Sequence, residues 1–151
     1  MCKTQSGALS ILWFTADGNV LRIDGKSISF QKNEMLCLTE FHHVEVLTLS
    51  AIRLIRFNRD FYCILEHDSE VSCKGILFFG AAHLPRFLME DSSLDVFETV
   101  FRMFKLELAN KDELQLEMLQ MMLKRFLILC TRSLKQQDKL SQNSTTAMWT
   151  L

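Results

Sequence analysis

The chain has 151 residues, and its 17 Lys and Arg residues against 18 Asp and Glu residues leave a formal net charge of -1. This length suits one core that buries about 68–70% of the unfolded chain's surface, and the 48% hydrophobic content excludes a disordered or fibrous protein. So small a charge gives no overall basic field to attract nucleic acid.

The cysteines and the apolar runs indicate a cytoplasmic protein. Five cysteines are an odd number and none of them forms a C-x-x-C pair, which argues against a secreted disulfide framework. The longest purely apolar run, Phe126 to Cys130, is far shorter than the ~20 residues that a membrane helix needs. We therefore expect reduced thiols and no membrane segment.

The first part of the chain consists of short apolar runs at strand spacing. Turn signals at Asp17-Gly18 and Asp24-Gly25 separate the first three runs and predict hairpins. Because no helical pattern intervenes, these runs predict a small β-sandwich or barrel. The predicted strands are 9–14, 20–23, 27–30, 35–39, 44–49, 51–57 and 76–79, and residues 60–74 are left as a connection.

Near Ser92 the pattern changes to helical spacing. Ser92 with Asp95 three positions on resembles a capping box and predicts a helix start. The apolar positions that follow share one helix face, which implies one buried side: Phe97, Val100, Phe101, Phe104 and Leu108. Asn110 followed by Glu113 predicts the start of a second helix, which runs to about Leu134.

This second helix has two apolar faces. One face carries Leu116, Leu119, Met122, Leu123, Phe126 and Cys130, and the other carries Leu114, Met118, Met121 and Ile128. A small domain offers little to cover the second face, so we predict a homodimer through Leu114, Met118, Met121, Arg125 and Ile128. The alternative is that both faces are buried within one subunit. Residues 136–151 are polar for most of their length and are predicted to be a linker.

No catalytic or metal-binding pattern stands out. His42 and His43 are adjacent, so on a strand they would point to opposite faces, and the spacing of Glu40, Glu45 and His83 does not suit a metal site. There is no G-x-S-x-G and no Gly-rich phosphate loop. We therefore expect no enzyme activity, no metal and no cofactor, and we interpret the two histidines as loop residues at the mouth of the barrel.

Three arginines within apolar strands are the candidate ligand contacts. Alternation puts Arg53 on the face of Ile55 and puts Arg56 on the opposite face, and Arg22 lies between two apolar residues. A guanidinium directed into a barrel needs an anionic partner, which a small effector could supply. The alternative is a strand-end arginine that reaches solvent or pairs with Asp24 or Glu45. The candidate ligand-binding residues are Arg22, His42, His43, Arg53 and Arg56.

In order and spacing, the chain from Leu9 to about Lys135 resembles the regulatory N-terminal region of AraC-type transcription regulators that carry a cupin-like sensor. The resemblance depends on residues 11–14, 20–24, 33–38 and 55–61, a loop with His42 or His43, and a helical pair ending near Thr131-Arg132. The family's Pro- and Gly-containing turn before the histidine is replaced here by Thr39-Glu40-Phe41-His42.

The resemblance implies a cupin-like (jelly-roll) β-barrel sensor at residues 1–90, which holds a small anionic or sugar-like effector, and a dimerising helical pair at 91–135. It also implies a linker at 136–151 toward a helix-turn-helix domain, through which alone the regulator would bind DNA. Two alternatives remain: a freestanding cupin enzyme or small-molecule-binding protein, and a structural domain with a filled barrel.

Overall fold

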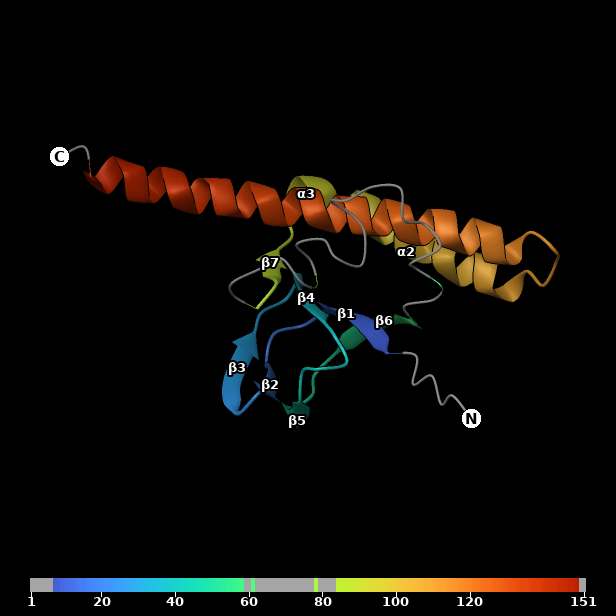
Figure 1. Ribbon diagram of the computed structural model, residues 1–151, viewed down its shortest axis with the longest axis horizontal. Coiled ribbons are helices and arrows are strands. Elements are labelled where there is room, and N and C mark those ends of the chain that lie inside the picture. The colour runs from blue at the N-terminus through green and yellow to red at the C-terminus, as the bar shows by residue number, and fades with distance from the viewer. Residues whose placement is uncertain (1–6, 59–60, 62–77, 79–83, 150–151) are drawn as a thin grey trace. The chain divides into compact units, whose positions relative to one another are not determined.

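The computed structural model describes residues 7–58, 61, 78 and 84–149. The chain divides into two compact units, Met1–Met89 and Glu90–Leu151, and Figure 1 shows strands in the first and a helical hairpin in the second. The strands are β1 (Ala8–Phe14), β2 (Asn19–Ile23), β3 (Lys26–Phe30), β4 (Glu34–Leu38), β5 (Val44–Thr48), β6 (Ile52–Asn58) and β7 (Arg86–Leu88). The helices are α2 (Asp91–Ala109) and α3 (Gln115–Trp149).

Six of the predicted strands are confirmed, each within one residue at either end. The short strand β7 was not predicted. The strand predicted at 76–79 lies outside the described residues except for Phe78, and the predicted connection 60–74 lies outside them except for Phe61. Phe78 is buried and packs edge-to-face on Phe57, with 6.0 Å between ring centroids.

The described strands form two antiparallel sheets, ordered β6-β1-β4-β7 and β3-β2-β5. No strand pairing joins one sheet to the other within these residues, although β5 and β6 follow each other in the chain. The mainly β class with two C-terminal helices is confirmed. The closed barrel is corrected to two open sheets, because β5 and β6 pair with different neighbours and each ends a sheet.

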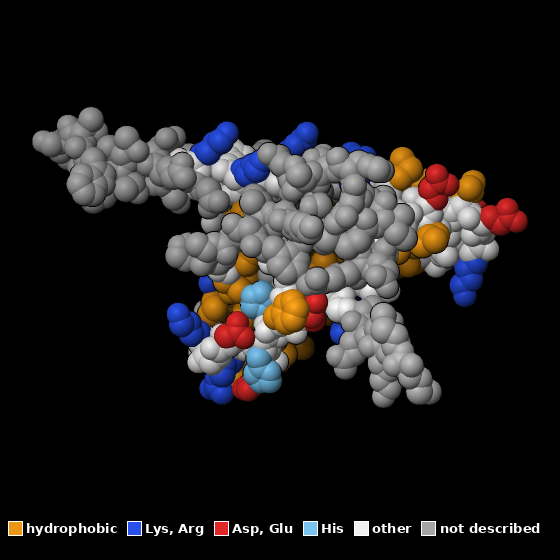
Figure 2. All heavy atoms as spheres, viewed as in Figure 1, with side chains coloured by type: hydrophobic (Ala, Val, Ile, Leu, Met, Phe, Trp, Pro, Cys, Tyr) orange, Lys and Arg blue, Asp and Glu red, His pale blue; other side chains and the backbone are white. Residues whose placement is uncertain are grey.

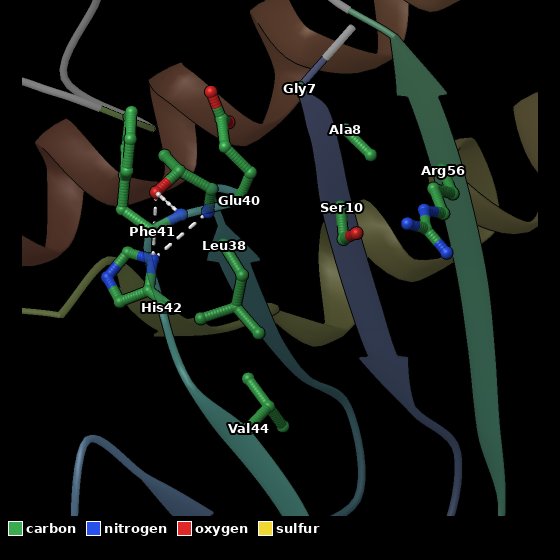
Figure 3. Close-up of a pocket in the computed structure, with 10 residues that line it drawn as sticks. Gly7, Ala8, Ser10, Leu38, Glu40, Phe41, His42, Val44 and Arg56 are labelled. Atoms are coloured by element: carbon green, nitrogen blue, oxygen red, sulfur yellow. Dashed lines mark hydrogen bonds between the residues drawn. The ribbon is translucent and has the colours of Figure 1, made fainter. Parts of the chain in front are cut away.

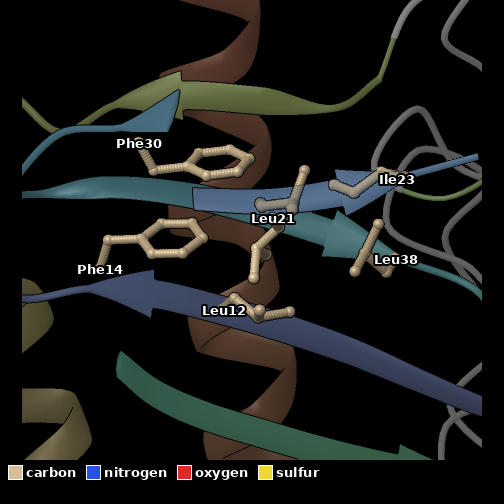
Figure 4. Packing of buried hydrophobic residues seen from close by; sticks show 7 residues of the cluster. Leu12, Phe14, Leu21, Ile23, Phe30 and Leu38 are labelled. Carbon is tan, nitrogen blue, oxygen red and sulfur yellow. The ribbon is translucent and has the colours of Figure 1, made fainter. Parts of the chain in front are cut away.

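The two sheets of the first unit enclose an apolar core between them (Figure 4). Phe14 from β1 stacks on Phe30 from β3, with 4.2 Å between ring centroids and 9° between ring planes. Alternation explains the composition, since every second residue of a strand points to the same side. The core residues are Leu12, Phe14, Leu21, Ile23, Phe30, Leu36 and Leu38.

The turn between β2 and β3 explains how a two-residue loop joins these strands. Asp24 and Gly25 both have positive φ, 50° and 85°, as the tightest hairpin turns require. The Asp24 carboxylate also accepts a hydrogen bond from the backbone N–H of His43, at 2.9 Å. The hairpin predicted at Asp24-Gly25 is thus confirmed, and its turn is hydrogen-bonded to the residue before β5. The hairpin predicted at Asp17-Gly18 is wrong, because β1 and β2 lie in different sheets and do not pair.

A buried ion pair connects β4 to β7. Both Nε and Nη2 of Arg86 donate to one oxygen of Glu34, at 3.0 and 2.7 Å, and the other Glu34 oxygen accepts the backbone N–H of Gln31. The Glu34 side chain is only 7% exposed, and the Arg86 guanidinium also covers the Phe30 ring at 4.6 Å. Every oxygen of this buried carboxylate therefore has a partner.

In the second unit, α2 and α3 pack as an antiparallel pair (Figure 1). The capping box is wrong, because α2 begins at Asp91 and no side chain caps its first turn. The second helix begins at Gln115 rather than Asn110, and the Gln115 side chain donates to the carbonyls of Glu107 and Leu108 at the end of α2.

The predicted end of the second helix near Leu134 is also wrong, since α3 continues to Trp149. No Gly or Pro follows Leu134 to interrupt it, and Lys and Gln are good helix formers without any apolar partner. A helix can also connect two domains, so the linker role of residues 136–151 stays a prediction.

Candidate functional site

A cavity of about 870 Å³ opens at one end of the first unit, where β1, β4 and β6 meet the loop between β4 and β5 (Figure 3). Its strand residues come from the face that also carries the core, so the cavity continues the space between the sheets. Its lining consists of Gly7, Ala8, Ser10, Leu38, Thr39, Glu40, Phe41, His42, Val44 and Arg56.

The loop Thr39–His42 is closed by His42. The Nδ1 atom of His42 accepts the backbone N–H of Thr39 at 3.0 Å and lies 3.1 Å from the Thr39 hydroxyl. An Nδ1 that accepts an N–H carries no proton, so the neutral ring holds its proton on Nε2. In Figure 3 this Nε2 points away from Ser10 and Arg56. His42 therefore positions the loop.

Arg56 enters the cavity because of its register on β6. It pairs with Ser10 of β1, and Figure 3 shows its guanidinium on the Ser10 side of the strand. Arg53 lies on the opposite face, beside Trp13, with its guanidinium 4.5 Å from the centre of that ring. The prediction that each face of this strand carries one arginine is confirmed.

The remaining two candidates lie at the surface, outside the cavity lining. Arg22 donates to Glu45 at 3.2 Å, and both side chains are nearly half exposed. The same Glu45 lies 3.5 Å from the His43 ring, which is 79% exposed. The alternative of an Arg22–Glu45 pair is the one observed. Of the five candidate ligand-binding residues, the structure brings His42 and Arg56 to one cavity.

The metal-binding potential of the described part of the chain and the reactivity of its Cys37 thiol are both low. No group of three His, Cys, Asp or Glu side chains there could hold a metal ion, and His83 lies outside that part. Complete burial raises the pKa of the Cys37 thiol from 9.0 to about 12, so the thiol stays protonated at neutral pH. Cys37 is therefore a packing residue of β4.

One face of α3 is buried around Phe126. The Phe126 ring packs edge-to-face on Phe97 and Phe104 of α2, with centroid distances of 5.5 and 6.2 Å. The predicted inner face is confirmed at Met122, Leu123, Phe126 and Cys130. Leu119 is only half-buried, and Leu116 is 59% exposed, so the prediction is wrong at Leu116.

The opposite flank of α3, together with Leu114 directly before the helix, is accessible. Leu114, Met118 and Met121 are 64%, 44% and 64% exposed, Arg125 is exposed and Ile128 is half-buried. Figure 2 shows exposed hydrophobic side chains near the turn between α2 and α3. This "outer flank", defined as Leu114, Met118, Met121, Arg125 and Ile128, is the second apolar face that the sequence predicted.

Sequence reasoning missed two parts of these surfaces. Ser10 and the loop from Thr39 to Phe41 line the cavity, and only the pairing of Ser10 with Arg56 would have pointed to them. The first helix also has a second apolar face, where Val96, Met103 and Leu106 are 37%, 44% and 67% exposed. Their spacing of seven and then three residues is a helical signal that was visible in the sequence.

None of the helices in the described residues combines the length and apolar character that crossing a membrane requires. A comparison with models of known protein families finds no match to this chain, and a comparison with curated proteins finds no similar sequence.

Proposed function

We propose that this chain is the regulatory domain of an AraC-type bacterial transcription regulator, which senses a small effector and dimerises in the cytoplasm. In this proposal the strand unit is a cupin-like sensor without enzyme activity, and the helical pair joins two subunits. DNA is contacted by a helix-turn-helix domain of the regulator, outside the residues described here. An effector acts by binding two arrangements of the dimer unequally.

The single observation that carries this proposal is the exposed outer flank of α3. Four apolar side chains and one arginine share this flank, and three of the apolar ones are more than two-fifths exposed. Exposed apolar surface of this kind marks an interaction site in a folded protein. A second copy of the chain is the simplest partner, since most soluble oligomers are two-fold symmetric homo-oligomers.

Two pairs of residues on or beside the flank are placed symmetrically about Met121. Leu114 and Ile128 lie seven residues on either side of it, and Glu117 and Arg125, both exposed, lie four residues on either side. Two antiparallel copies of α3 that cross at Met121 would therefore place Glu117 opposite Arg125 of the partner subunit, twice. Self-complementary charge beside an apolar centre favours this pairing over an unrelated partner.

The cavity supports the sensor part of the proposal. Its volume of about 870 Å³ is within the range of small-molecule sites, and a guanidinium and a hydroxyl lie among its apolar residues. The filled-barrel alternative predicts packed side chains at this place. The two open sheets joined in one core are compatible with a jelly roll, whose strands also form two sheets.

Met121→Asp is expected to give a folded monomer, whereas the unaltered chain is a dimer. The aspartate side chain is accessible in the folded subunit, but in the dimer it would bury two carboxylates against each other. Sedimentation equilibrium measures the mass, and circular dichroism checks that the helices remain. Fused to a DNA-binding domain that needs a dimeric partner, the same variant should lose binding to a two-half-site operator.

Leu116→Asp is the matched control for this experiment. It makes the same chemical change five residues away, at an exposed position off the outer flank, and should leave the dimer intact. A monomeric unaltered chain, or a Met121→Asp protein that stays dimeric, would contradict the proposed interface.

A charge exchange tests the antiparallel geometry separately. Glu117→Arg puts two guanidinium groups opposite each other at both ends of the crossing and should weaken the dimer roughly tenfold. Adding Arg125→Glu restores opposite charges and should return the dissociation constant to within about threefold of the original value. If the double variant dimerises more weakly than Glu117→Arg alone and Arg125→Glu alone, α3 does not cross its partner at Met121.

A further inference from the structure

The cavity of the strand unit is lined by one positively charged side chain, Arg56. Arg56 has no hydrogen bond or ion pair with any residue in the described part of the chain, in contrast to Arg22 with Glu45 and Arg86 with Glu34. Its strand neighbour Ser10 supplies a hydroxyl on the same side. A guanidinium with a nearby donor matches the planar oxygens of a carboxylate.

The cavity also limits how much negative charge it can accept. Glu40 lines it too, and a Cβ added at Gly7 would overlap the Glu40 carboxylate, so this acid lies against bare backbone at the cavity edge. His42 adds no charge while its Nδ1 accepts the Thr39 N–H. A ligand with one negative charge meets less repulsion from the Glu40 carboxylate than a dianion such as a phosphate monoester does.

Apart from Thr39, the remaining lining is apolar. Leu38 is 4% exposed and Val44 is 37% exposed, and both side chains lie beside the cavity in Figure 3. They give an apolar body a surface to pack against, next to the polar end formed by Ser10 and Arg56.

We propose that this cavity binds a small monocarboxylate with an apolar body, whose carboxylate is held by Arg56 and Ser10 and whose body packs on Leu38 and Val44. The inference rests on the proposed sensor function and names the class of its effector. Arg56 supplies the binding charge, Glu40 disfavours dianions, and His42 positions the loop that carries Glu40.

Titration of the full chain with three matched probes, benzoate, benzyl alcohol and phenyl phosphate, tests this by ligand-observed NMR. Benzoate should bind saturably and at least about tenfold more tightly than the other two. Arg56→Gln should remove this preference. The matched control is Arg53→Gln, on the same strand but facing Trp13, and it should bind benzoate as the unaltered chain does. Glu40→Gln should strengthen binding of phenyl phosphate relative to benzoate.

Three results would overturn the inference: no saturable benzoate binding, equal binding of benzoate and benzyl alcohol, or unchanged benzoate binding by Arg56→Gln. Sedimentation of the same samples separates this inference from the proposed function. A dimer that ignores benzoate overturns the carboxylate site alone, and a monomer that binds benzoate overturns the dimerising role alone.

Discussion

Phe126→Asp is expected to abolish the folded helical pair. Phe126 is fully buried and its ring contacts Phe97 and Phe104, so truncation alone would cost about 3–5 kcal/mol. The aspartate would in addition place an unpaired carboxylate among aromatic rings, which costs several kcal/mol more. Together these losses approach the whole stability of a small domain, about 5–15 kcal/mol. Far-UV circular dichroism and urea unfolding measure the result.

Leu116→Asp again serves as the control, because sequence periodicity places Leu116 on the same face as Phe126 while the structure leaves it 59% exposed. Its stability should stay within about 0.5 kcal/mol of the unaltered chain. Equal destabilisation by the two substitutions would mean that the inner face of α3 extends to its first turn. A folded Phe126→Asp protein would contradict the observed packing of α2 on α3.

Glu34→Gln is expected to destabilise the strand unit by about 2–4 kcal/mol. The new amide would direct N–H groups or a neutral oxygen at Arg86, and the partly buried guanidinium would lose its counter-charge. The cost is placed below that of a fully buried pair because the Arg86 side chain is 35% exposed and partly solvated. Urea unfolding followed by tryptophan fluorescence measures the change, since Trp13 lies on β1 next to β4.

The same substitution at an exposed pair gives the comparison. Glu45→Gln removes the partner of Arg22, where both side chains are nearly half exposed, and should change stability by less than about 1 kcal/mol. Equal effects at Glu34 and Glu45 would mean that burial of the β4–β7 ion pair contributes little to its strength.

Local sequence patterns were enough to predict an element where its conformation depends mainly on residues close to it in the chain. The strands β1 to β6 follow from short apolar runs at strand spacing and from turn residues such as Asp24-Gly25, which readily adopt positive φ. The two faces of α3 follow in the same way from the helical repeat. The strand β7, three residues long, is too short for alternation to identify, and its pairing with β4 is supported by Glu34 and Arg86, 52 residues apart.

The boundaries of α3, in contrast, could not be predicted from local sequence patterns. Apolar periodicity predicted the buried part of α3, but helical backbone continues through polar residues to Trp149 because intrahelical hydrogen bonds need no buried face. The predicted start at Asn110 failed because Asp112 and Gln115 bond to the turn and to the end of α2 instead.

Three features could be predicted from the amino-acid pattern alone: the order of short strands and then helices, the position of Phe126 on a buried face, and the second apolar flank around Met121. Three others depend on contacts between distant segments: the described strands form two open sheets, Arg56 and not Arg22 or Arg53 lines the cavity, and Leu116 is exposed. The reason is that periodicity fixes which residues share a face, whereas pairing between distant strands decides what that face meets.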